Sequence, residues 1–517
     1  MEILKTSQPI SWLDGVDLNG NVIQKDHELN GQNIAGKELH IPGSIGSTVG
    51  SYKIYSLAKR GFAPKKIIIE NKDDAITIWG AIFGKIPFEI SGWKPQKVDI
   101  DKIEKLNLSE EIKEKLVKIA ELYETDEFIE TKNLPKQISG VSYKTITDAG
   151  LNLIEDLAED FRVNQLSMLN PAGMDLTRWR EQRVPKDFAE KQIRIIKAYE
   201  KMGAMITCTC TPYHLPRIYS LISRLKSFGN VNLHWAESSA VVYANSVLGL
   251  RTNREGLSAL FYAIAGFAPV YGLHLDENRN PNIKIKVEAN LKTINDFATF
   301  GYWLGEKIKD KIPYISGIKK SSPSLNFRSL YHGIAEIPFL ERLKALGAAG
   351  AASGSLALFH VEGITPEAVR KSIFLDRIED TLFFEEIDLK STKEKLNTGE
   401  EKDVDLVAFG CPHSSLDEIK TISKYLFGKK IRDGVDLWVC TSRDVKMQAD
   451  NLGYTLTIED AGGKVFCDTC MIVAPIEDIG YKTTATNSAK AAYYLTRFCK
   501  QKVVYGDVKE IIKLVVK

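Results

Sequence analysis

Residues 207–213 read TCTCTPY, so two cysteines lie one residue apart and are followed by a proline, directly after an apolar helical run. Two more cysteine segments lie far away in the chain, GCPH at residues 410–413 and a C-x-x-C pair at residues 467–470. Thiolates that meet from distant loops are what an iron-sulfur cluster needs, whereas a disulfide is not expected in the cytosol. The three segments are therefore predicted to form one metal site.

Composition sets the class of protein. A chain of 517 residues is too long for a single core, so two to four domains are expected. Its 44% hydrophobic and 26% charged residues are ordinary for a globular protein. A formal charge of +2 gives no general attraction to nucleic acid or to an anionic membrane. The expected partner is a small molecule, and the sequence gives no signal for an oligomeric state.

The start of the chain and the cysteine count indicate a cytoplasmic protein. The N-terminal MEILKTSQPISWLDG has an acid at Glu2 and no apolar segment followed by a cleavage site, so it is not a signal peptide. No run of eighteen apolar residues is present. Seven cysteines are too few, too irregular and odd in number for a disulfide framework. Reduced thiols, some of them metal ligands, are expected.

A change of character near residue 95 predicts two domains and a linker. Residues 1–95 are rich in strands and turns, with β-branched runs at KIIIE (66–70) and AITIW (75–79). The charged residues 96–105 are predicted to be the linker. Residues 106–517 alternate helical stretches, the first with apolar residues at positions 112, 116, 119 and 122, with short β-like runs. That alternation predicts an α/β large domain.

Within the N-terminal part, residues 42–51 read PGSIGSTVGS and lead into a predicted helix over 52–60 that Gly61 can end. Ser47 or Thr48 can cap this helix, which leaves its first amides free to meet an anion. By itself, such a loop is more often only a flexible turn with a cap.

The cysteine segments share a local context. The runs 405–409 (DLVAF) and 464–466 (KVF) are predicted strands that lead directly to Cys411 and to Cys467. In a parallel sheet such positions gather at one edge. Cys440 and Cys499 are interpreted as packing residues, at a strand end and on the amphipathic stretch 488–500.

The spacing of the cysteines favours an open metal site over a structural zinc. Structural zinc takes four ligands, usually as two local pairs, and C-x-x-C alone is shared by zinc, redox and cluster sites. A C-x-C, a single Cys-Pro and a C-x-x-C instead favour three thiolates with one metal position open, where iron can act as a Lewis acid. A non-catalytic zinc or redox-sensing protein is the alternative, and seven buried structural cysteines are a third interpretation.

A dense polar cluster covers residues 234–256, HWAESSAVVYANSVLGLRTNREG. Polar groups in such an apolar frame either satisfy one another or await a polar substrate, since an unsatisfied one costs roughly 1 to 3 kcal/mol. Arg251 and Arg254 favour a carboxylate or phosphate site, because a guanidinium binds either group bidentately. His274 and Arg279 follow in YGLHLDENR. The side chains expected at this site are Ser238, Ser239, Asn245, Arg251, Arg254 and Arg279.

Taken together, these segments closely resemble the aconitase X family. PGSIGSTVGS and GAIFGKIP resemble its small swivelling domain, and its large domain is resembled, in order, by NPAGMDLTRW, TCTPY, WAESSAVVYANSVLG, RTNREG, YGLHLDENR, SGSLALFHVEGITPEA, GCPH and DTC. The resemblance implies an α/β fold: an aconitase-like large domain of several α/β subdomains and a small swivelling β/α domain at the N-terminus. The active site would lie between them and hold an iron-sulfur cluster or a mononuclear iron.

Matched residue by residue, the resemblance assigns metal ligation to Cys210, Cys411 and Cys470, with Cys208 and Cys467 as rival ligands. It assigns the role of base to Ser47, whose alkoxide would need helix N-terminal amides or an arginine.

The reaction that the resemblance implies is a hydro-lyase step on a small hydroxy acid. Two substrates are associated with the family, cis-3-hydroxy-L-proline and (R)-5-phosphomevalonate. Because both domains are fused in one chain, cis-3-hydroxy-L-proline dehydration is the leading expectation, and phosphomevalonate dehydration is the alternative.

Overall fold

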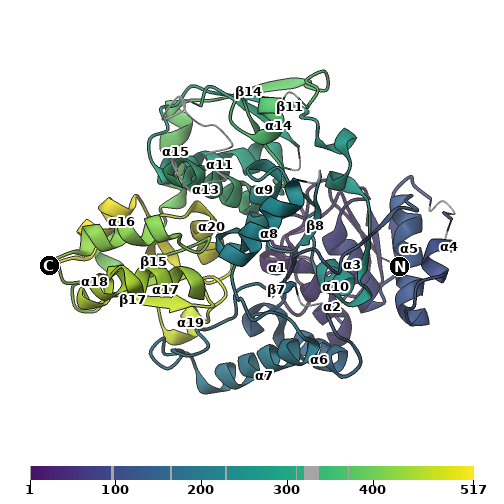
Figure 1. Cartoon of the computed structure of the whole chain (residues 1–517), viewed down its shortest axis with the longest axis horizontal. Coiled ribbons are helices and arrows are strands. Elements are labelled where there is room, and N and C mark those ends of the chain that lie inside the picture. The colour runs from purple at the N-terminus through teal and green to yellow at the C-terminus, as the bar shows by residue number, and fades with distance from the viewer. Residues whose placement is uncertain are drawn as a thin grey trace.

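The computed structural model describes residues 2–94, 98–99, 101–163, 166–227, 230–309, 311–318, 337–370 and 372–517. The described residues form α-helices around five sheets, four of which are wholly parallel (Figure 1). The N-terminal strands lie near the centre and right of the view, and the C-terminal sheet lies at the left (Figure 1). Parallel sheets covered by helices are the pattern of an α/β protein, as the sequence predicts.

The N-terminal unit is a parallel sheet in the order β1-β2-β3-β4 with two main helices. Its strands are β1 (Ile3–Lys5), β2 (Glu38–Ile41), β3 (Lys66–Ile69) and β4 (Phe88–Ile90). Helix α2 (Gly50–Arg60) ends at Gly61, which has a left-handed φ of 80° as predicted. The expected side-chain cap is wrong: the N-cap residue is Val49, and neither Ser47 nor Thr48 caps the helix.

The run AITIW is a helix and not a strand, which corrects the prediction. It opens α3 (Ala75–Gly84), because the side chain of Asp74 accepts the backbone N–H of Thr77 and caps the helix. Burial then overrides the strand preference of β-branched residues. A Cβ at Gly80 would lie 2.7 Å from a side-chain atom of Ile54, so α3 packs closely on α2.

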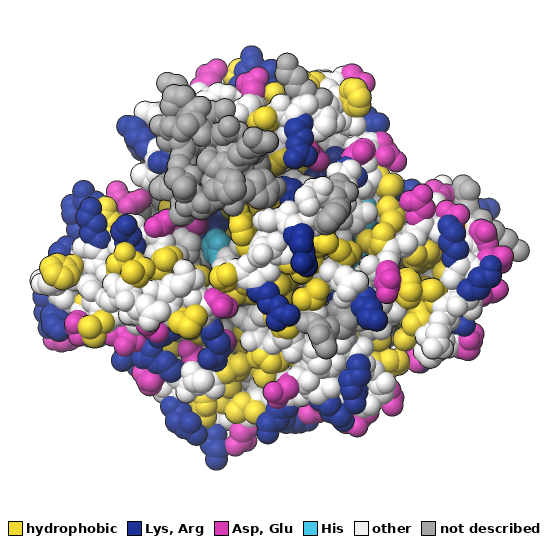
Figure 2. Space-filling view, in the orientation of Figure 1, with side chains coloured by type: hydrophobic (Ala, Val, Ile, Leu, Met, Phe, Trp, Pro, Cys, Tyr) yellow, Lys and Arg dark blue, Asp and Glu magenta, His cyan; other side chains and the backbone are white. Residues whose placement is uncertain are grey.

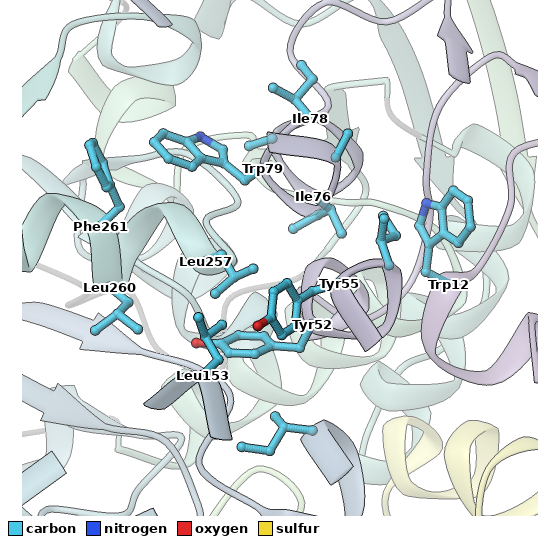
Figure 3. Packing of buried hydrophobic residues seen from close by; sticks show 14 of the residues in the cluster. Trp12, Tyr52, Tyr55, Ile76, Ile78, Trp79, Leu153, Leu257, Leu260 and Phe261 are labelled. Atoms are coloured by element: carbon cyan, nitrogen blue, oxygen red, sulfur yellow. The ribbon is translucent and has the colours of Figure 1, made fainter. Parts of the chain in front are cut away.

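One hydrophobic cluster joins the N-terminal unit to the next part of the chain. Figure 3 shows Trp79 of α3 beside Phe261, with Leu257 close to Tyr52 of α2. The rings of Trp79 and Phe261 have centroids 4.8 Å apart. Phe261 and Leu257 belong to α10 (Leu257–Ala265), so this helix packs against the N-terminal unit.

The predicted linker lies partly outside the described residues, which omit 95–97 and 100. Within it lies the short α4 (Asp101–Glu104). The predicted helix that follows is confirmed as α5 (Glu110–Tyr123).

A second parallel sheet follows, in the order β7-β6-β8-β9, with β6 (Lys136–Ile138), β7 (Ser167–Leu169), β8 (Asn232–Trp235) and β9 (Arg251–Thr252). Around it lie α6 (Tyr143–Asp160), α7 (Lys186–Met202), α8 (Pro216–Lys226) and α9 (Ser238–Ser246). An antiparallel pair, β5 (Phe128–Glu130) with β10 (Phe267–Pro269), lies beside it. The run after α7 forms only an isolated bridge between Met205 and Met168, so the first cysteine segment is a loop.

The remaining chain forms two more parallel sheets. One has the order β13-β12-β11-β14: β11 (Ile283–Val287), β12 (Pro313–Ser316), β13 (His360–Val361) and β14 (Asp380–Phe384), with α11 (Ile294–Ile308), α13 (Ile337–Ser353), α14 (Pro366–Arg370) and α15 (Glu386–Leu396). The last has the order β17-β16-β15-β18-β19: β15 (Leu406–Phe409), β16 (Asp436–Thr441), β17 (Lys464–Cys467), β18 (Thr483–Thr486) and β19 (Lys502–Tyr505). Its helices include α16 (Leu416–Leu426), α17 (Arg443–Asn451), α18 (Tyr454–Asp460), α20 (Ala489–Arg497) and α21 (Val508–Val515).

The surface agrees with the low net charge of the sequence. On the face shown in Figure 2, basic and acidic side chains are interspersed and do not gather into one patch. Among the described residues, no helix combines the length and apolar character needed to cross a bilayer.

Candidate active site

Three cysteine loops and the loop before α2 meet at one cavity of about 70 Å³, which we call the thiol cavity. Cys210, Cys411 and Cys470 line it, and so does Ser47. These residues come from segments more than a hundred residues apart in most cases, so the fold alone brings them together. Strands β15, β16 and β17 are parallel neighbours, which places the second and third cysteine loops at the same edge of one sheet.

His413 ties the three cysteine loops to one another. Its Nε2 lies 2.9 Å from the backbone oxygen of Thr469, and its Nδ1 lies 3.0 Å from Oγ1 of Thr209. Burial lowers the pKa of His413 to about 4, so the ring is neutral at pH 7. A carbonyl can only accept, so Nε2 carries the proton and Nδ1 accepts from the threonine hydroxyl. The backbone N–H of His413 also donates to Sγ of Cys210, at 3.2 Å.

Local geometry fixes the GCPH loop. Gly410 has a φ of 96°, and a Cβ there would lie 2.1 Å from the backbone oxygen of Cys440, so only glycine fits. Ser488, the N-cap of α20, donates to the backbone oxygen of Cys411 and accepts the N–H of Ala491. The second cysteine loop is thus attached to both the neighbouring strand and a helix start.

All seven cysteines are buried and free, but they differ in position. Cys208 and Cys467 are buried without lining the thiol cavity. Burial, together with the charge of Glu237, raises the pKa of the Cys210 thiol to about 12, and burial raises those of Cys411 and Cys470. A thiol with a raised pKa must lose its proton before it binds a metal.

A charged pair that local sequence reasoning did not assign lies on the same cavity. Lys490 of α20 donates to the carboxylate of Glu237 and, at 3.1 Å, to Oγ of Ser239. Asn170 Nδ2 donates to the same carboxylate at 3.2 Å. Burial alone would raise the pKa of Glu237, but the charge of Lys490 and the hydrogen bonds lower it, so the carboxylate is ionised. Glu237 and Lys490 are 253 residues apart, and nothing local to either indicates the pair.

The loop of residues 42–49, which we call the serine loop, carries Ser47 into the thiol cavity. The backbone N–H of Val49 donates to Oγ of Ser47 at 3.3 Å. Arg254 Nη2 donates to the backbone oxygen of Gly46 at 2.5 Å, one residue away. An amide therefore bonds to this hydroxyl, and an arginine from a distant part of the chain bonds to the residue that precedes Ser47.

A larger cavity of about 450 Å³, the polar cavity, is lined by Ser44 and Ile45 of the same serine loop. Arg254, Lys309 and Arg377 contribute positive charge to its walls.

The side chains predicted to bind substrate are divided between these places. Ser238 lines the thiol cavity and Arg254 lines the polar cavity, whereas Ser239, Asn245, Arg251 and Arg279 line neither. Arg279 pairs with Glu367, with Nε to Oε1 at 2.7 Å. Arg251 donates to the backbone oxygen of His274 at 2.7 Å. Asn245 donates to the backbone oxygens of Thr252 and Ala357 at 2.8 Å. These residues form a structural network.

Comparison with protein families covers nearly the whole chain. Models of the aconitase X swivel domain, first domain, second domain and third domain match residues 2–113, 103–277, 281–394 and 404–517. The chain belongs to the aconitase X family. One solved relative, Thermococcus kodakaraensis aconitase X in the holo-form, is 39% identical, with a TM-score of 0.67, over 78% of this chain and 95% of that one. The predicted family and fold class are confirmed.

Three similar proteins are subunits or whole chains of dehydratases. The phosphomevalonate dehydratase large subunit of Methanocaldococcus jannaschii is 48% identical over 77% of this chain and 93% of its own length. The cis-3-hydroxy-L-proline dehydratase of Pseudomonas aeruginosa is 30% identical over 100% of this chain and 94% of its own. The phosphomevalonate dehydratase small subunit of Pyrococcus abyssi is 44% identical over 20% of this chain and 74% of its own. This aconitase X is therefore an enzyme of the hydro-lyase class, as predicted.

Proposed function

We propose that this aconitase X dehydrates a small β-hydroxy acid, with an iron-sulfur cluster held by Cys210, Cys411 and Cys470 and with Ser47 as the base. The observation that carries the proposal is that these four residues line one cavity. Cys208 and Cys467, the rival ligands, do not line it. Their burial elsewhere supports the assignment that the family resemblance gives.

The donor set fits an iron-sulfur cluster better than a single ion. Among the described residues, no group of three or more His, Cys, Asp or Glu side chains is arranged to hold a metal ion. In a cluster each thiolate binds a different iron atom, so the sulfurs need not converge on one point. Three buried, unpaired thiols on one cavity are suited to that arrangement. When bound, the cluster would supply an iron that acts as a Lewis acid towards the substrate hydroxyl.

Residues of the chain itself would remove the substrate proton and stabilise the negative charge of the substrate carboxylate. In both candidate substrates the hydroxyl lies on the carbon β to a carboxylate. The proton that is removed therefore comes from the α-carbon, which lies between the carboxylate and the carbon that bears the hydroxyl. Ser47 Oγ would take this proton, and the N–H of Val49, which already donates to Oγ, would favour the ionised hydroxyl. As the carbon–hydrogen electrons form the double bond, the hydroxyl would depart as water with a proton from the solvent, and the proton held by Ser47 would return to the solvent. Lys490 would stabilise the carboxylate, because it is the only Lys or Arg among the described residues lining the thiol cavity.

Phosphomevalonate is the substrate that we favour. Identity to the large subunit of phosphomevalonate dehydratase is 48%, against 30% to the hydroxyproline enzyme. A further 20% of the chain has 44% identity to the small subunit of phosphomevalonate dehydratase, so the matches to both subunits support this choice. The polar cavity shares the serine loop with the thiol cavity, and its positive side chains are consistent with a phosphorylated substrate.

Cis-3-hydroxy-L-proline remains a second candidate because of one observation. The hydroxyproline dehydratase of Pseudomonas aeruginosa aligns with the whole of this fused chain, whereas the phosphomevalonate subunits align with separate parts of it. The fusion of both domains in one chain is also the reason why the sequence favours hydroxyproline dehydration.

The test is an anaerobic assay of the iron-replete protein with each substrate in turn. Dehydration lowers the product mass by one water, which mass spectrometry detects. Turnover of phosphomevalonate with kcat/KM at least a hundredfold above that of hydroxyproline supports the proposal. The reverse preference selects the second candidate, and an inactive protein that retains zinc would support a non-catalytic metal protein instead.

A further inference from the structure

The serine loop is held from outside by a second segment, residues 254–257, which we call the clamp segment. Arg254 Nη2 donates to the backbone oxygen of Gly46 at 2.5 Å, inside the serine loop. At the other end of the clamp segment, the backbone N–H of Leu257 donates to Oγ of Ser51 at 3.1 Å, in the first turn of α2. The clamp segment therefore contacts the serine loop at its middle and just beyond its end.

Between these two contacts the backbones approach closely. A Cβ at Gly256 would lie 2.6 Å from Oγ of Ser51 and 2.8 Å from the backbone oxygen of Thr48. Only a glycine allows this approach without displacing the serine loop. A shift of the clamp segment by a fraction of an ångström would thus be transmitted to the backbone around Ser47.

The side chain of Glu255 fixes the clamp segment to the interior. It is fully buried, and its carboxylate accepts hydrogen bonds from the hydroxyls of Ser258 and Tyr271. The same Ser258 hydroxyl oxygen accepts the backbone N–H of Gly256 at 3.1 Å. One carboxylate therefore connects the clamp segment to the start of α10 and to Tyr271, which precedes the short 3-10 helix η2 (Gly272–His274).

Neutral rings enclose this carboxylate. Nδ1 of His234 lies 3.4 Å from Oε1 of Glu255, and the ring of Tyr123 stacks on that of Tyr271 with centroids 3.7 Å apart. Burial lowers the pKa of His234 to about 3, so this ring is neutral. No Lys or Arg of the described residues forms an ion pair with Glu255, and burial raises its pKa to about 7.

We propose that Glu255 is a positioning residue for the reaction: through the clamp segment it holds the serine loop so that Ser47 points into the thiol cavity. It does not reach the thiol cavity itself. The proposal rests on the proposed role of Ser47 only for its kinetic consequence. Its structural content, that Glu255 orders the serine loop, can be tested whatever Ser47 does.

The first experiment measures hydrogen exchange of the full-length enzyme in peptides covering residues 42–51. Glu255→Ala should speed exchange in this segment by about tenfold or more, and Glu255→Gln, which keeps an acceptor and the side-chain volume, should restore part of the protection. Asp296→Ala is the matched control: Asp296 is a buried acid that caps α11 and pairs with Lys393, away from the serine loop. Unchanged exchange in Glu255→Ala, or equal acceleration in the control, would overturn the proposal.

The second experiment separates positioning from general destabilisation. In the holoenzyme, Glu255→Gln should lower kcat by about tenfold with KM changed less than twofold, and it should leave the iron content at the wild-type level. A fall in thermal stability with kcat retained would mean that Glu255 is only structural, and would also overturn the proposal. If Ser47→Ala stays active while the exchange result holds, the role of Ser47 fails and the positioning of its loop stands.

Discussion

The two cavities that share the serine loop differ in what their walls offer a ligand. The thiol cavity has one charged pair, Glu237 with Lys490, beside thiols and mostly apolar groups. The polar cavity is larger and has three cationic side chains, among them Lys309 and Arg377, together with several asparagines. A small, mostly apolar site strengthens electrostatic interactions at reacting atoms, whereas a wide, polar site suits recognition of a hydrated anion. On the proposed function, bond breaking would take place in the thiol cavity and recognition of the phosphate in the polar cavity, and the serine loop contributes residues to both.

The largest expected effect comes from removing a ligand at the thiol cavity. Cys411→Ser should lose most of the bound iron and reduce turnover to background, because a hydroxyl is a poor ligand for a cluster iron. Metal analysis and visible absorbance of anaerobically purified protein measure the loss. Cys467→Ser is the matched control, since Cys467 is buried nearby without lining the cavity. Wild-type iron content in Cys411→Ser would remove this residue from the ligand set.

Replacement of the base comes next. Ser47→Ala should lower kcat by roughly 10²–10⁴-fold, the usual contribution of a positioned base, and leave the iron content unchanged. Anaerobic steady-state kinetics measure this change. The control is Ser44→Ala, in the same loop. It should have a much smaller effect on kcat, because Ser44 lines the polar cavity and its hydroxyl donates to Asp74. Equal losses in both variants would mean that the loop, and not the Ser47 hydroxyl, matters.

His413 should prove important for stability as well as for the metal. His413→Ala leaves the hydroxyl of Thr209 and the backbone oxygen of Thr469 without their buried partner, at a cost of about 1–3 kcal/mol for each group. We expect a lower melting temperature together with reduced iron content. His360→Ala is the control, because His360 is equally buried but bonds to the backbone oxygen of Arg279, far from the cysteine loops along the chain. Full iron content in His413→Ala would contradict the idea that the hydrogen bonds of His413 hold the three cysteine loops in place for the metal.

The sequence predicts the strands that carry the cysteine loops of the thiol cavity better than it predicts the charged side chains that line this cavity. Cys411 follows a buried strand of branched and aromatic residues, which local periodicity detects. The helix that begins at Ala75 was missed because its β-branched residues favour a strand, and the Asp74 cap and burial decide otherwise. Lys490 was missed for a different reason. Its partner Glu237 lies on another sheet's edge, and only the folded chain shows that they meet.

Lys490 offers a way to sharpen the comparison within the thiol cavity. Lys490→Met should raise KM for either substrate and lower kcat/KM by about 10–100-fold, which corresponds to a charged hydrogen bond of about 1.5–3 kcal/mol. Lys393→Met is the control, since Lys393 also pairs with a buried acid, Asp296, but lines neither cavity. An unchanged KM would mean that the pair with Glu237 is purely structural.

The smallest effect is expected in the polar cavity, and it tests whether that cavity recognises a phosphate. Lys309 and Arg377 are both exposed, so each should contribute only about 0.2–1 kcal/mol to the binding of an anion. Lys309→Gln combined with Arg377→Gln should therefore raise KM for phosphomevalonate by about two- to thirtyfold, with kcat unchanged and with a weaker dependence on salt. Lys307→Gln, an exposed change on the same helix that does not line the polar cavity, controls for net charge. If the double variant and the control give the same KM, the cations of the polar cavity do not contact the substrate, and recognition would have to come from the thiol cavity alone.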